Sequence, residues 1–205
     1  MTKIKICGIT CYEDALKAKK AGAWAIGEIF APSSRRITIE KAAFINHKIG
    51  DGIAKVGVFV NESIDNVNTV AKECNLDFVQ LHGDENKDYV KELNIPVIKA
   101  FAVNKKITPL DLKDWSVFAY LFDTYSLNKR GGTGKTFDWS LIEDIISCYR
   151  VIIAGGLTPT NIGYVVKKFK PYAVDVSSGV ESIQGIKDTQ RIDEFIFKVK
   201  EAQKL

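Results

Sequence analysis

The sequence has few of the residues that build metal sites, disulfide frameworks or membrane spans. Two histidines and four cysteines occur in 205 residues, with no CxxC pair: His47, His82, Cys7, Cys11, Cys74 and Cys148. This scarcity argues against a closed zinc site and predicts free thiols in a reducing cytoplasm. No stretch approaches the roughly 20 apolar residues of a membrane-spanning helix, and residues 1–6 lack the apolar core of a signal peptide. We therefore expect a cytoplasmic protein with no metal.

Charge of neither sign dominates the chain. Lys and Arg number 29 and Asp and Glu number 25, so the net charge is +4. The basic runs at 17–20 and 167–170 fall within helix-like segments, where such runs are typical of a solvated face. We therefore expect neither nucleic acid nor membrane as a partner. Hydrophobic residues at 46% and charged residues at 26% are typical of a globular chain with a sizeable core.

Short apolar, β-branched segments alternate with amphipathic ones through the whole chain. This alternation predicts a parallel sheet, because each crossover helix returns the chain to the same edge. Eight units in 205 residues favour an α/β fold of the TIM-barrel type, a single-domain (β/α)8 barrel over residues 1–205, with an open doubly wound sheet as the alternative. The predicted strands are Lys3–Cys7, Trp24–Phe30, Ile53–Val60, Leu76–Leu81, Pro96–Phe101, Val117–Phe122, Val151–Ala154 and Tyr172–Val176. The predicted helices lie near Tyr12–Lys20, Ile39–Lys48, Ile64–Cys74, Asn86–Leu93, Pro109–Asp114, Trp139–Cys148, Pro159–Phe169 and Thr189–Glu201.

Two predicted helices carry start signals. Thr10 with Glu13 fits a capping box, in which both side chains satisfy free backbone N–H groups. Thr158 before Pro159 places a capping hydroxyl ahead of a proline whose fixed φ suits the first helical position. We therefore expect helices to begin at Tyr12 and Pro159.

Polar and reactive residues gather where the predicted strands end. In parallel α/β folds, ligands bind beyond the carboxyl ends of the strands. The strand bodies are apolar, so this clustering predicts a binding site at one mouth of the barrel. The residues at these ends are Cys7, Arg35, Arg36, Asn61, His82, Asp123, Gly155, Gly156, Asp175, Ser177, Ser178 and Gly179.

The last two strand ends have the composition of a phosphate site. Gly155-Gly156 follows the seventh strand, and Ser177-Ser178 with Gly179 follows the eighth. Glycine lets backbone N–H groups approach an anion closely, and a following helix adds the positive end of its dipole. We expect Gly155, Gly156, Ser177 and Ser178 to bind phosphate, although tight turns alone would also use these glycines.

The glycine-rich segment 131–136 resembles a P-loop but lacks the required spacing. The motif needs Gly five positions before Gly134, where Lys129 stands, and no clear helix opens at Lys135. We interpret the segment as a flexible active-site lid.

Cys7 and Asp123 form a candidate acid/base pair. Cys7 ends a strand just before Gly8 and should face the open end, where positive charge would favour its thiolate. Asp123 follows an apolar strand, so burial could keep it protonated as a general acid. Either residue alone has a structural explanation, as a buried hydrophobe or a helix cap.

Two further strand-end residues are open to two interpretations. Arg35 and Arg36 are either solvated or positioned to clamp a carboxylate through two parallel hydrogen bonds. His82 is either a structural histidine or a ligand contact.

A series of short motifs runs in order from about Lys3 to Asp188. They are KICGIT at 5–10, VGVFVN at 56–61, VQLHG at 79–83, FDT at 122–124, GGTG at 131–134, FDW at 137–139, AGGL at 154–157, DVSSGVE at 175–181 and GIKD at 185–188. Each motif alone is weak, but the ordered set resembles the phosphoribosylanthranilate isomerase family of tryptophan biosynthesis. The resemblance implies an Amadori rearrangement that converts an aminoaldose phosphate into an aminodeoxyribulose phosphate.

The resemblance also implies roles for the site residues. Asp123 would protonate the furanose ring oxygen, and Cys7 would remove the proton next to the resulting Schiff base. Arg36 would bind the anthranilate carboxylate, Asp175 would meet a sugar hydroxyl, and His82 would line the site. The phosphate would be held by backbone amides of Gly155, Gly156, Ser177 and Ser178. The implied enzyme is a monomer or a homodimer that needs no metal or redox cofactor.

One position departs from the family pattern. Glu28 stands in the second predicted strand, where the family usually has an apolar residue. A buried carboxylate is costly when unpaired, so Glu28 should find a cation, reach solvent or stay protonated.

Other functions stay open on the residues alone. A sugar-phosphate epimerase or an indole-glycerol-phosphate synthase would also use a phosphate-binding barrel, although those enzymes rely on other catalytic side chains. A non-catalytic barrel that binds a phosphorylated ligand is a third possibility.

Overall fold

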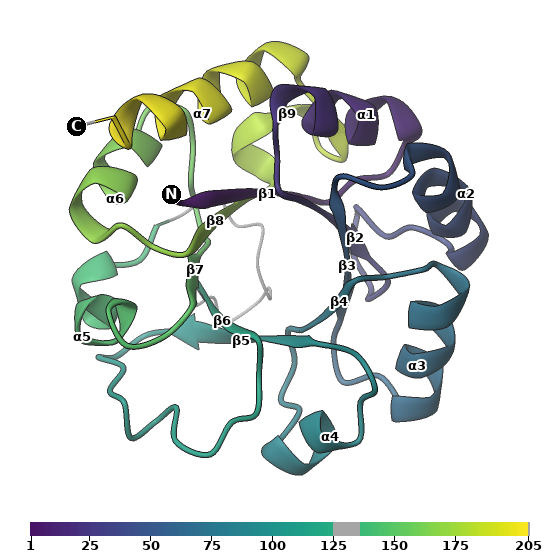
Figure 1. The fold of residues 1–205 in the computed structure, drawn as a ribbon, viewed down its shortest axis with the longest axis horizontal. Helices are drawn as coiled ribbons and strands as arrows, with labels where there is room; N and C mark the ends of the chain where they lie inside the picture. Colours follow the sequence, from purple (N-terminus) through teal and green to yellow (C-terminus); the bar gives the residue numbers. More distant parts are fainter. Residues whose placement is uncertain (125–135, 205) are drawn as a thin grey trace.

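Eight parallel strands close into a barrel in the computed structural model, which describes residues 1–124 and 136–204. Strand order follows chain order, and β8 pairs with β1 to complete the ring (Figure 1). The prediction of a (β/α)8 barrel is therefore confirmed, and the open sheet was the wrong alternative. The barrel strands are β1 (Lys3–Cys7), β2 (Ala25–Ile29), β3 (Ala54–Phe59), β4 (Phe78–Leu81), β5 (Val97–Val103), β6 (Ala119–Thr124), β7 (Val151–Ile153) and β8 (Ala173–Val176).

Helices surround the barrel and cover the outer faces of its strands (Figure 1). The long helix α7 (Thr189–Ala202) shows why: it buries Ile192, Phe195, Ile196 and Val199, a spacing that places all four on one helical face. In the described ranges, no helix combines the length and apolarity needed to cross a membrane. The other helices are α1 (Tyr12–Ala21), α2 (Ile39–Ile49), α3 (Ile64–Glu73), α4 (Lys87–Lys91), the 3-10 helix η1 (Trp139–Ile142), α5 (Glu143–Ile146) and α6 (Ile162–Phe169).

Aromatic rings cover the amino-terminal mouth of the barrel. The rings of Trp24, Phe78, Phe118 and Tyr172 contact one another in a closed circuit, with centroid separations of 4.7 to 5.9 Å. They pack against a layer of small and branched side chains inside the barrel. Lys3 Nζ lies 5.0 Å from the Trp24 ring and 4.9 Å from the Tyr172 ring, close enough for cation–π contacts. Aromatic rings therefore close this mouth, and the polar residues of the barrel interior lie toward the other one.

The predicted fifth helix was wrong, because residues 109–114 form a series of turns. The Asp111 carboxylate accepts hydrogen bonds from the backbone N–H and the hydroxyl of Thr108, at 2.8 and 2.6 Å. Asp114 then adopts a positive φ of 64°, which stops helical propagation. Leu112 is buried while Leu110 is exposed, so the segment anchors to the barrel without an amphipathic helix. This stretch belongs to the loop that joins β5 to β6, and Figure 1 shows that loop in the space between α4 and α5.

Helix α1 begins at Tyr12 as predicted, but its predicted capping box was wrong, and so was the predicted start of α6. The Thr10 hydroxyl donates to the carbonyl of Gly185 at 2.9 Å, and Cys11, which precedes α1, makes no side-chain capping bond. Helix α6 begins at Ile162 rather than Pro159, because the Asn161 side chain accepts from the Thr158 N–H at 2.9 Å and closes a turn first. In each case the expected capping residue forms a hydrogen bond that the local sequence pattern did not indicate.

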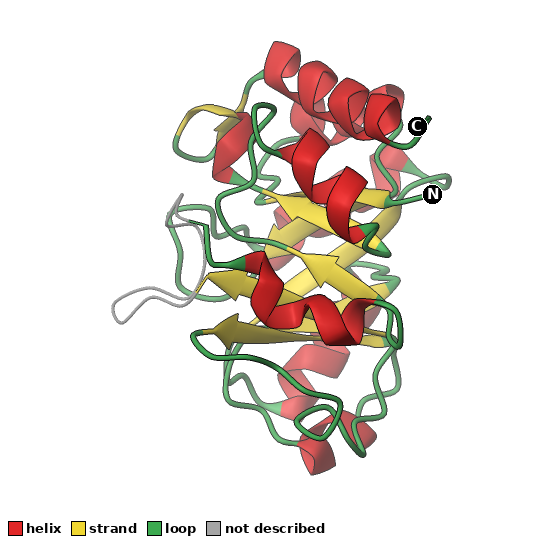
Figure 2. Ribbon diagram, turned by 90° about the vertical axis from the view of Figure 1, so that its left-hand side faces the viewer, coloured by secondary structure: helices red, strands yellow, loops and turns green. Residues whose placement is uncertain are grey.

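A hairpin between β8 and α7 was not predicted. Its strands are β9 (Glu181–Ile183) and β10 (Ile186–Lys187), preceded by the short 3-10 helix η2 (Ser178–Val180). Gly185 has a φ of 87°, a conformation that glycine adopts readily in a tight turn. Figure 2 shows the hairpin on the side to which the barrel strands point, with both chain termini at the opposite side.

Glu28 lies on β2 beneath α2, fully buried on the outer face of the barrel. Asn46 donates from Nδ2 to the Glu28 carboxyl at 2.8 Å and to the carbonyl of Cys74 at 2.9 Å. Burial raises the pKa of Glu28 to about 7, although Asn46 and the positive charge of Lys55 act in the opposite direction. Glu28 Oε1 and Asn46 Oδ1 are buried without a hydrogen-bond partner in the described residues, so a proton on the carboxyl would supply a missing donor.

Replacing Glu28 with Gln is expected to stabilise the protein increasingly as pH rises. The folded state binds the Glu28 proton with a pKa of about 7 instead of 4.5, so wild type loses stability as pH rises from 4.5 to 7. At about 1.4 kcal/mol per pKa unit, the loss is at most about 3 kcal/mol. Urea unfolding near pH 4.5 and above pH 7 measures it, with Glu73→Gln at an exposed position as the control. An equal difference between Glu28→Gln and wild type at both pH values would contradict the expectation.

Candidate active site

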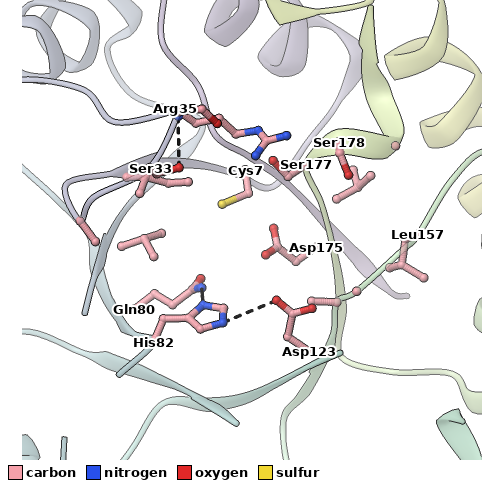
Figure 3. Close-up of a pocket in the computed structure, with 18 of the residues that line it drawn as sticks. Cys7, Ser33, Arg35, Gln80, His82, Asp123, Leu157, Asp175, Ser177 and Ser178 are labelled. Atoms are coloured by element: carbon pink, nitrogen blue, oxygen red, sulfur yellow. Dashed lines mark hydrogen bonds and ion pairs between the residues drawn. The ribbon is translucent and has the colours of Figure 1, made fainter. Parts of the chain in front are cut away.

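A cavity of about 530 Å³ opens at the carboxyl ends of the strands (Figure 3). It is lined by strand ends and by the loops that follow β2, β7 and β8. The structure brings predicted site residues as distant in sequence as Cys7 and Ser178, 171 positions apart, to one cavity wall, as predicted for a site at this mouth. The predicted site residues on its wall are Cys7, His82, Asp123, Gly155, Gly156, Asp175, Ser177 and Ser178.

Arg36 is the one predicted site residue that does not line this cavity in the described structure. Its side chain is exposed, and its backbone pairs with Ile29 at the end of β2. The neighbouring Arg35 lines the cavity instead and is buried. The loop Pro32–Ser34 before it forms part of the same wall, so Arg36 lies just outside the rim.

Cys7 ends β1 and points into the cavity opposite Asp123 (Figure 3). Only 6% of Cys7 is exposed, and burial raises the pKa of its thiol above the ordinary value of 9.0. Lys5 acts against this effect, and Asp175 acts with it. The next residue, Gly8, has a φ of 77°, which turns the chain out of the barrel directly after the thiol.

Asp123 delivers a carboxyl group from the apolar strand β6 into the cavity. Burial raises its pKa to about 6, although its Oδ1 accepts a hydrogen bond from the Thr124 N–H at 2.7 Å. A Cβ atom at Gly155 would lie 2.8 Å from Asp123 Oδ1 and 2.3 Å from the Thr124 hydroxyl. Glycine at 155 therefore leaves the space that the acid occupies.

His82 and Gln80 approach Asp123 from β4 and the residue that follows it. His82 Nε2 lies 3.5 Å from Asp123 Oδ2, and His82 Nδ1 lies 3.1 Å from Gln80 Nε2 (Figure 3). With the amide donating to Nδ1, the imidazole carries its proton on Nε2 and presents it to the carboxylate. The contact can therefore orient the Asp123 side chain.

The loops after β7 and β8 pack backbone to backbone beside the cavity. Gly155 and Gly156 have φ values of 81° and 61°. A Cβ atom at Gly179 would lie 1.9 Å from the carbonyl oxygen of Leu157, so only glycine allows the two loops to approach. The Ser177 hydroxyl is buried and makes no hydrogen bond in the described residues. These features suit a ligand oxygen that accepts from backbone N–H groups and a hydroxyl.

Charged side chains attach the hairpin to the rim of the cavity. Arg35 donates from Nε and Nη2 to the two oxygens of Glu181, both at 2.7 Å. Lys187 Nζ lies 2.8 Å from Glu181 Oε1 and 3.2 Å from the Ser177 carbonyl oxygen. Burial acts to raise the pKa of Glu181, but its two cationic partners dominate and lower it to about 2. Two cations against one carboxylate leave positive charge beside Ser177.

Sequence reasoning did not select Gln80, Lys5 or Arg35 as site residues. Gln80 precedes His82 by two positions and Lys5 precedes Cys7 by two, so strand alternation could have placed each on the same face as its neighbour. Arg35 was noticed but not chosen over Arg36. Its pairing with Glu181 joins segments 146 residues apart, and no local signal specifies it.

The glycine-rich segment interpreted as a lid lies largely outside the described residues. Among residues 1–124 and 136–204, no group of three or more His, Cys, Asp or Glu side chains is arranged to hold a metal ion.

Comparisons with known proteins agree on one family. The family model described as N-(5'-phosphoribosyl)anthranilate (PRA) isomerase matches residues 4–198. The chain is 49% identical over 201 residues to the N-(5'-phosphoribosyl)anthranilate isomerase of Syntrophomonas wolfei, with 98% of each sequence covered.

Solved structures are similar over nearly the full length. The phosphoribosyl anthranilate isomerase of Thermus thermophilus superimposes with a TM-score of 0.90 and 35% identity, covering 98% of this chain and 99% of that one. A phosphoribosyl anthranilate isomerase in complex with reduced 1-(o-carboxyphenylamino)-1-deoxyribulose 5-phosphate has a TM-score of 0.86 and 38% identity, covering 98% of this chain and 100% of that one.

Proposed function

The chain belongs to the N-(5'-phosphoribosyl)anthranilate isomerase family, an isomerase of tryptophan biosynthesis, and we propose that Asp123 and Cys7 are the general acid and general base of its reaction. The observation that carries the proposal is the placement of both side chains on the wall of one cavity, with Asp175 between them in the view of Figure 3. The relatives' shared name favours this isomerase over a sugar-phosphate epimerase or an indole-glycerol-phosphate synthase.

Asp123 acts first, as the acid. Its carboxyl group gives a proton to the furanose ring oxygen, the bond from that oxygen to C1 breaks, and the nitrogen lone pair forms the Schiff base. A pKa of about 6, raised by burial, lets a usable fraction of Asp123 carry its proton near neutral pH. The His82 imidazole, 3.5 Å away, holds the carboxylate that remains.

Cys7 then acts as the base. Its thiolate removes the proton from C2, and that electron pair forms the C1–C2 double bond of an enolamine while the Schiff base nitrogen accepts the displaced pair. The enolamine tautomerises to the ketose. Transfer of one proton from Cys7 back to Asp123, through product or solvent, restores the starting state.

The remaining residues bind and orient the substrate. Backbone N–H groups at Gly155, Gly156, Ser177 and Ser178 hold the phosphate of the substrate. A relative of 38% identity in complex with a reduced deoxyribulose 5-phosphate compound supports a phosphorylated ligand. Asp175, on the cavity wall, accepts a hydrogen bond from a sugar hydroxyl. Arg36, exposed just beyond the rim, turns inward to pair with the anthranilate carboxylate through two hydrogen bonds.

The pH profile of kcat/KM is expected to be bell-shaped. The reactive state has Asp123 protonated and Cys7 ionised, whereas the pKa of Asp123 is about 6 and burial raises that of Cys7 above 9.0. Below pH 6 both groups are protonated, so the Cys7 thiolate needed as base is lost. Above the thiol pKa both groups are ionised, so the Asp123 proton needed as acid is lost. The rate should therefore fall on either side of a plateau between these values.

Loss of the fluorescence of the anthranilate adduct, followed on purified protein across a pH series, measures this profile. A rate that continues to rise above the thiol limb would contradict the assignment of Asp123 as acid. Tight ligand binding with no loss of fluorescence would instead favour a barrel that binds the substrate without turnover.

We also propose the setting in which the enzyme works. A catalytic Cys7 must be a free thiol, which a reducing cytoplasm maintains. The catalytic unit is a single domain over residues 1–205, which acts as a monomer or within a homodimer. Neither the reaction nor the predicted site calls for nucleic acid or a membrane.

A further inference from the structure

Lys5 is a fully buried cation inside the barrel. It lies on β1 two residues before Cys7, so the alternation of strand side chains points both inward. Its Nζ donates to Asp175 Oδ1 at 3.0 Å. Burial alone would lower the pKa of Lys5, but the charges of Asp175 and Cys7 outweigh it and raise that pKa. Lys5 is therefore positively charged, and only part of its three-donor capacity is used by Asp175.

The Lys5 ammonium group lies beside the Cys7 thiol. Gly27 on β2 is the residue paired with Cys7, and a Cβ atom built there would lie 2.7 Å from Cys7 Sγ and 2.9 Å from Lys5 Nζ. Both atoms therefore occupy the space that the missing side chain leaves free. An ordinary side chain at position 27 would separate or displace them.

We propose that Lys5 is a positioning residue whose ammonium group, anchored by Asp175, stabilises the Cys7 thiolate during proton abstraction. The proposal deepens the proposed function and rests on Cys7 being the base. Asp175 then has two roles: its carboxylate accepts a hydrogen bond from the sugar, and by pairing with Lys5 it determines how strongly the Lys5 charge acts on the thiol.

Two other cations, Lys187 and Arg35, lie near the thiol, but hydrogen bonds to other groups occupy more of their donors. Lys187 is bound to Glu181 and to the Ser177 carbonyl, and Arg35 uses two donors on Glu181. Among the influences on Cys7, Lys5 is the largest that opposes the effect of burial on the thiol pKa. The titratable and charged groups that face Cys7 or share its cavity wall are Lys5, Arg35, His82, Asp123, Asp175 and Lys187, with Glu181 behind them.

The test is the pH dependence of Cys7 alkylation by iodoacetamide, followed by mass spectrometry of the Cys7 peptide. In Lys5→Gln the midpoint should rise by about one pH unit or more, because an opposite charge at this range shifts a pKa by roughly 1–3 units. At neutral pH, kcat should fall by at least about tenfold, with KM little changed. Lys3→Gln is the matched control, since Lys3 lies on the same strand and face but is exposed at the other mouth.

Asp175→Asn provides the opposite test and preserves the shape of the side chain. It removes a negative charge near the thiol and frees Lys5, so the alkylation midpoint should fall. Thermal melts establish that each variant is folded. If Lys5→Gln does not fold because it leaves Asp175 buried without its cation, the double variant Lys5→Gln/Asp175→Asn replaces it, and its midpoint should lie above that of Asp175→Asn.

An unchanged midpoint in a folded Lys5→Gln, or in Asp175→Asn, would overturn the proposal, because a merely structural lysine would affect stability and not thiol ionisation. Failure of the proposed function is recognised separately. Near-normal turnover in Cys7→Ala would remove Cys7 as base, while the alkylation midpoints would still report whether Lys5 acts on the thiol.

Discussion

Replacing Asp123 with Asn is expected to lower kcat by about 10²–10⁴-fold and to leave KM nearly unchanged. An amide has no proton of suitable acidity to give to the ring oxygen, but it has the shape of the carboxyl group it replaces. The Asn side-chain oxygen can still accept the 2.7 Å hydrogen bond from the Thr124 N–H. The defect should therefore appear in the chemical step, and the adduct-fluorescence assay under saturating substrate measures it.

The same substitution is expected to stabilise the fold at neutral pH. Burial raises the pKa of Asp123 from 3.8 to about 6, so the folded state loses stability as pH rises between these values. At about 1.4 kcal/mol per unit, Asn should recover on the order of 1–3 kcal/mol above pH 6. Asp51→Asn, at an exposed position, is the control for both readings. A folded Asp123→Asn with wild-type kcat would exclude the residue as the acid.

Replacing Cys7 with Ala is expected to lower kcat about as much as Asp123→Asn does, by about 10²–10⁴-fold. The substitution removes one buried sulfur atom and leaves Lys5 and Asp175 bound to each other at 3.0 Å, so the site should keep its form. Cys7→Ser should be equally inactive, because a hydroxyl ionises far less readily than a thiol.

Two measurements separate the Cys7 chemistry from a general effect of cysteine removal. Single-turnover kinetics should show slow chemistry with substrate affinity nearly intact. Cys148→Ser, which changes an exposed thiol, should retain full activity. Activity of Cys7→Ala close to that of wild type would rule out the thiol as the base.

The sequence predicted the site well where strand periodicity controls it. Cys7 ends β1, His82 follows β4, and Asp123 and Asp175 lie one residue before the ends of β6 and β8. The closed barrel brings all of these strand ends to one mouth. The same periodicity could have placed Lys5 inside, but a lysine within an apolar strand gives no sign of which carboxylate will pair with it.

Features that depend on distant partners were not predictable. Arg35 was not preferred to Arg36, because its bidentate partner Glu181 lies in a hairpin that has no alternating apolar pattern. Thr10 fits a capping box but bonds to Gly185, 175 residues away. Glu28 could be recognised as unusual, yet its contact with Asn46 required the packing of α2 on β2.

The circuit formed by Trp24, Phe78, Phe118 and Tyr172 has a consequence for turnover. Because these rings close the amino-terminal mouth of the described barrel, substrate and product must both pass through the mouth at the carboxyl ends of the strands. While the ketose product occupies the cavity, the next aldose substrate cannot bind. Added product should therefore act as a competitive inhibitor of the substrate.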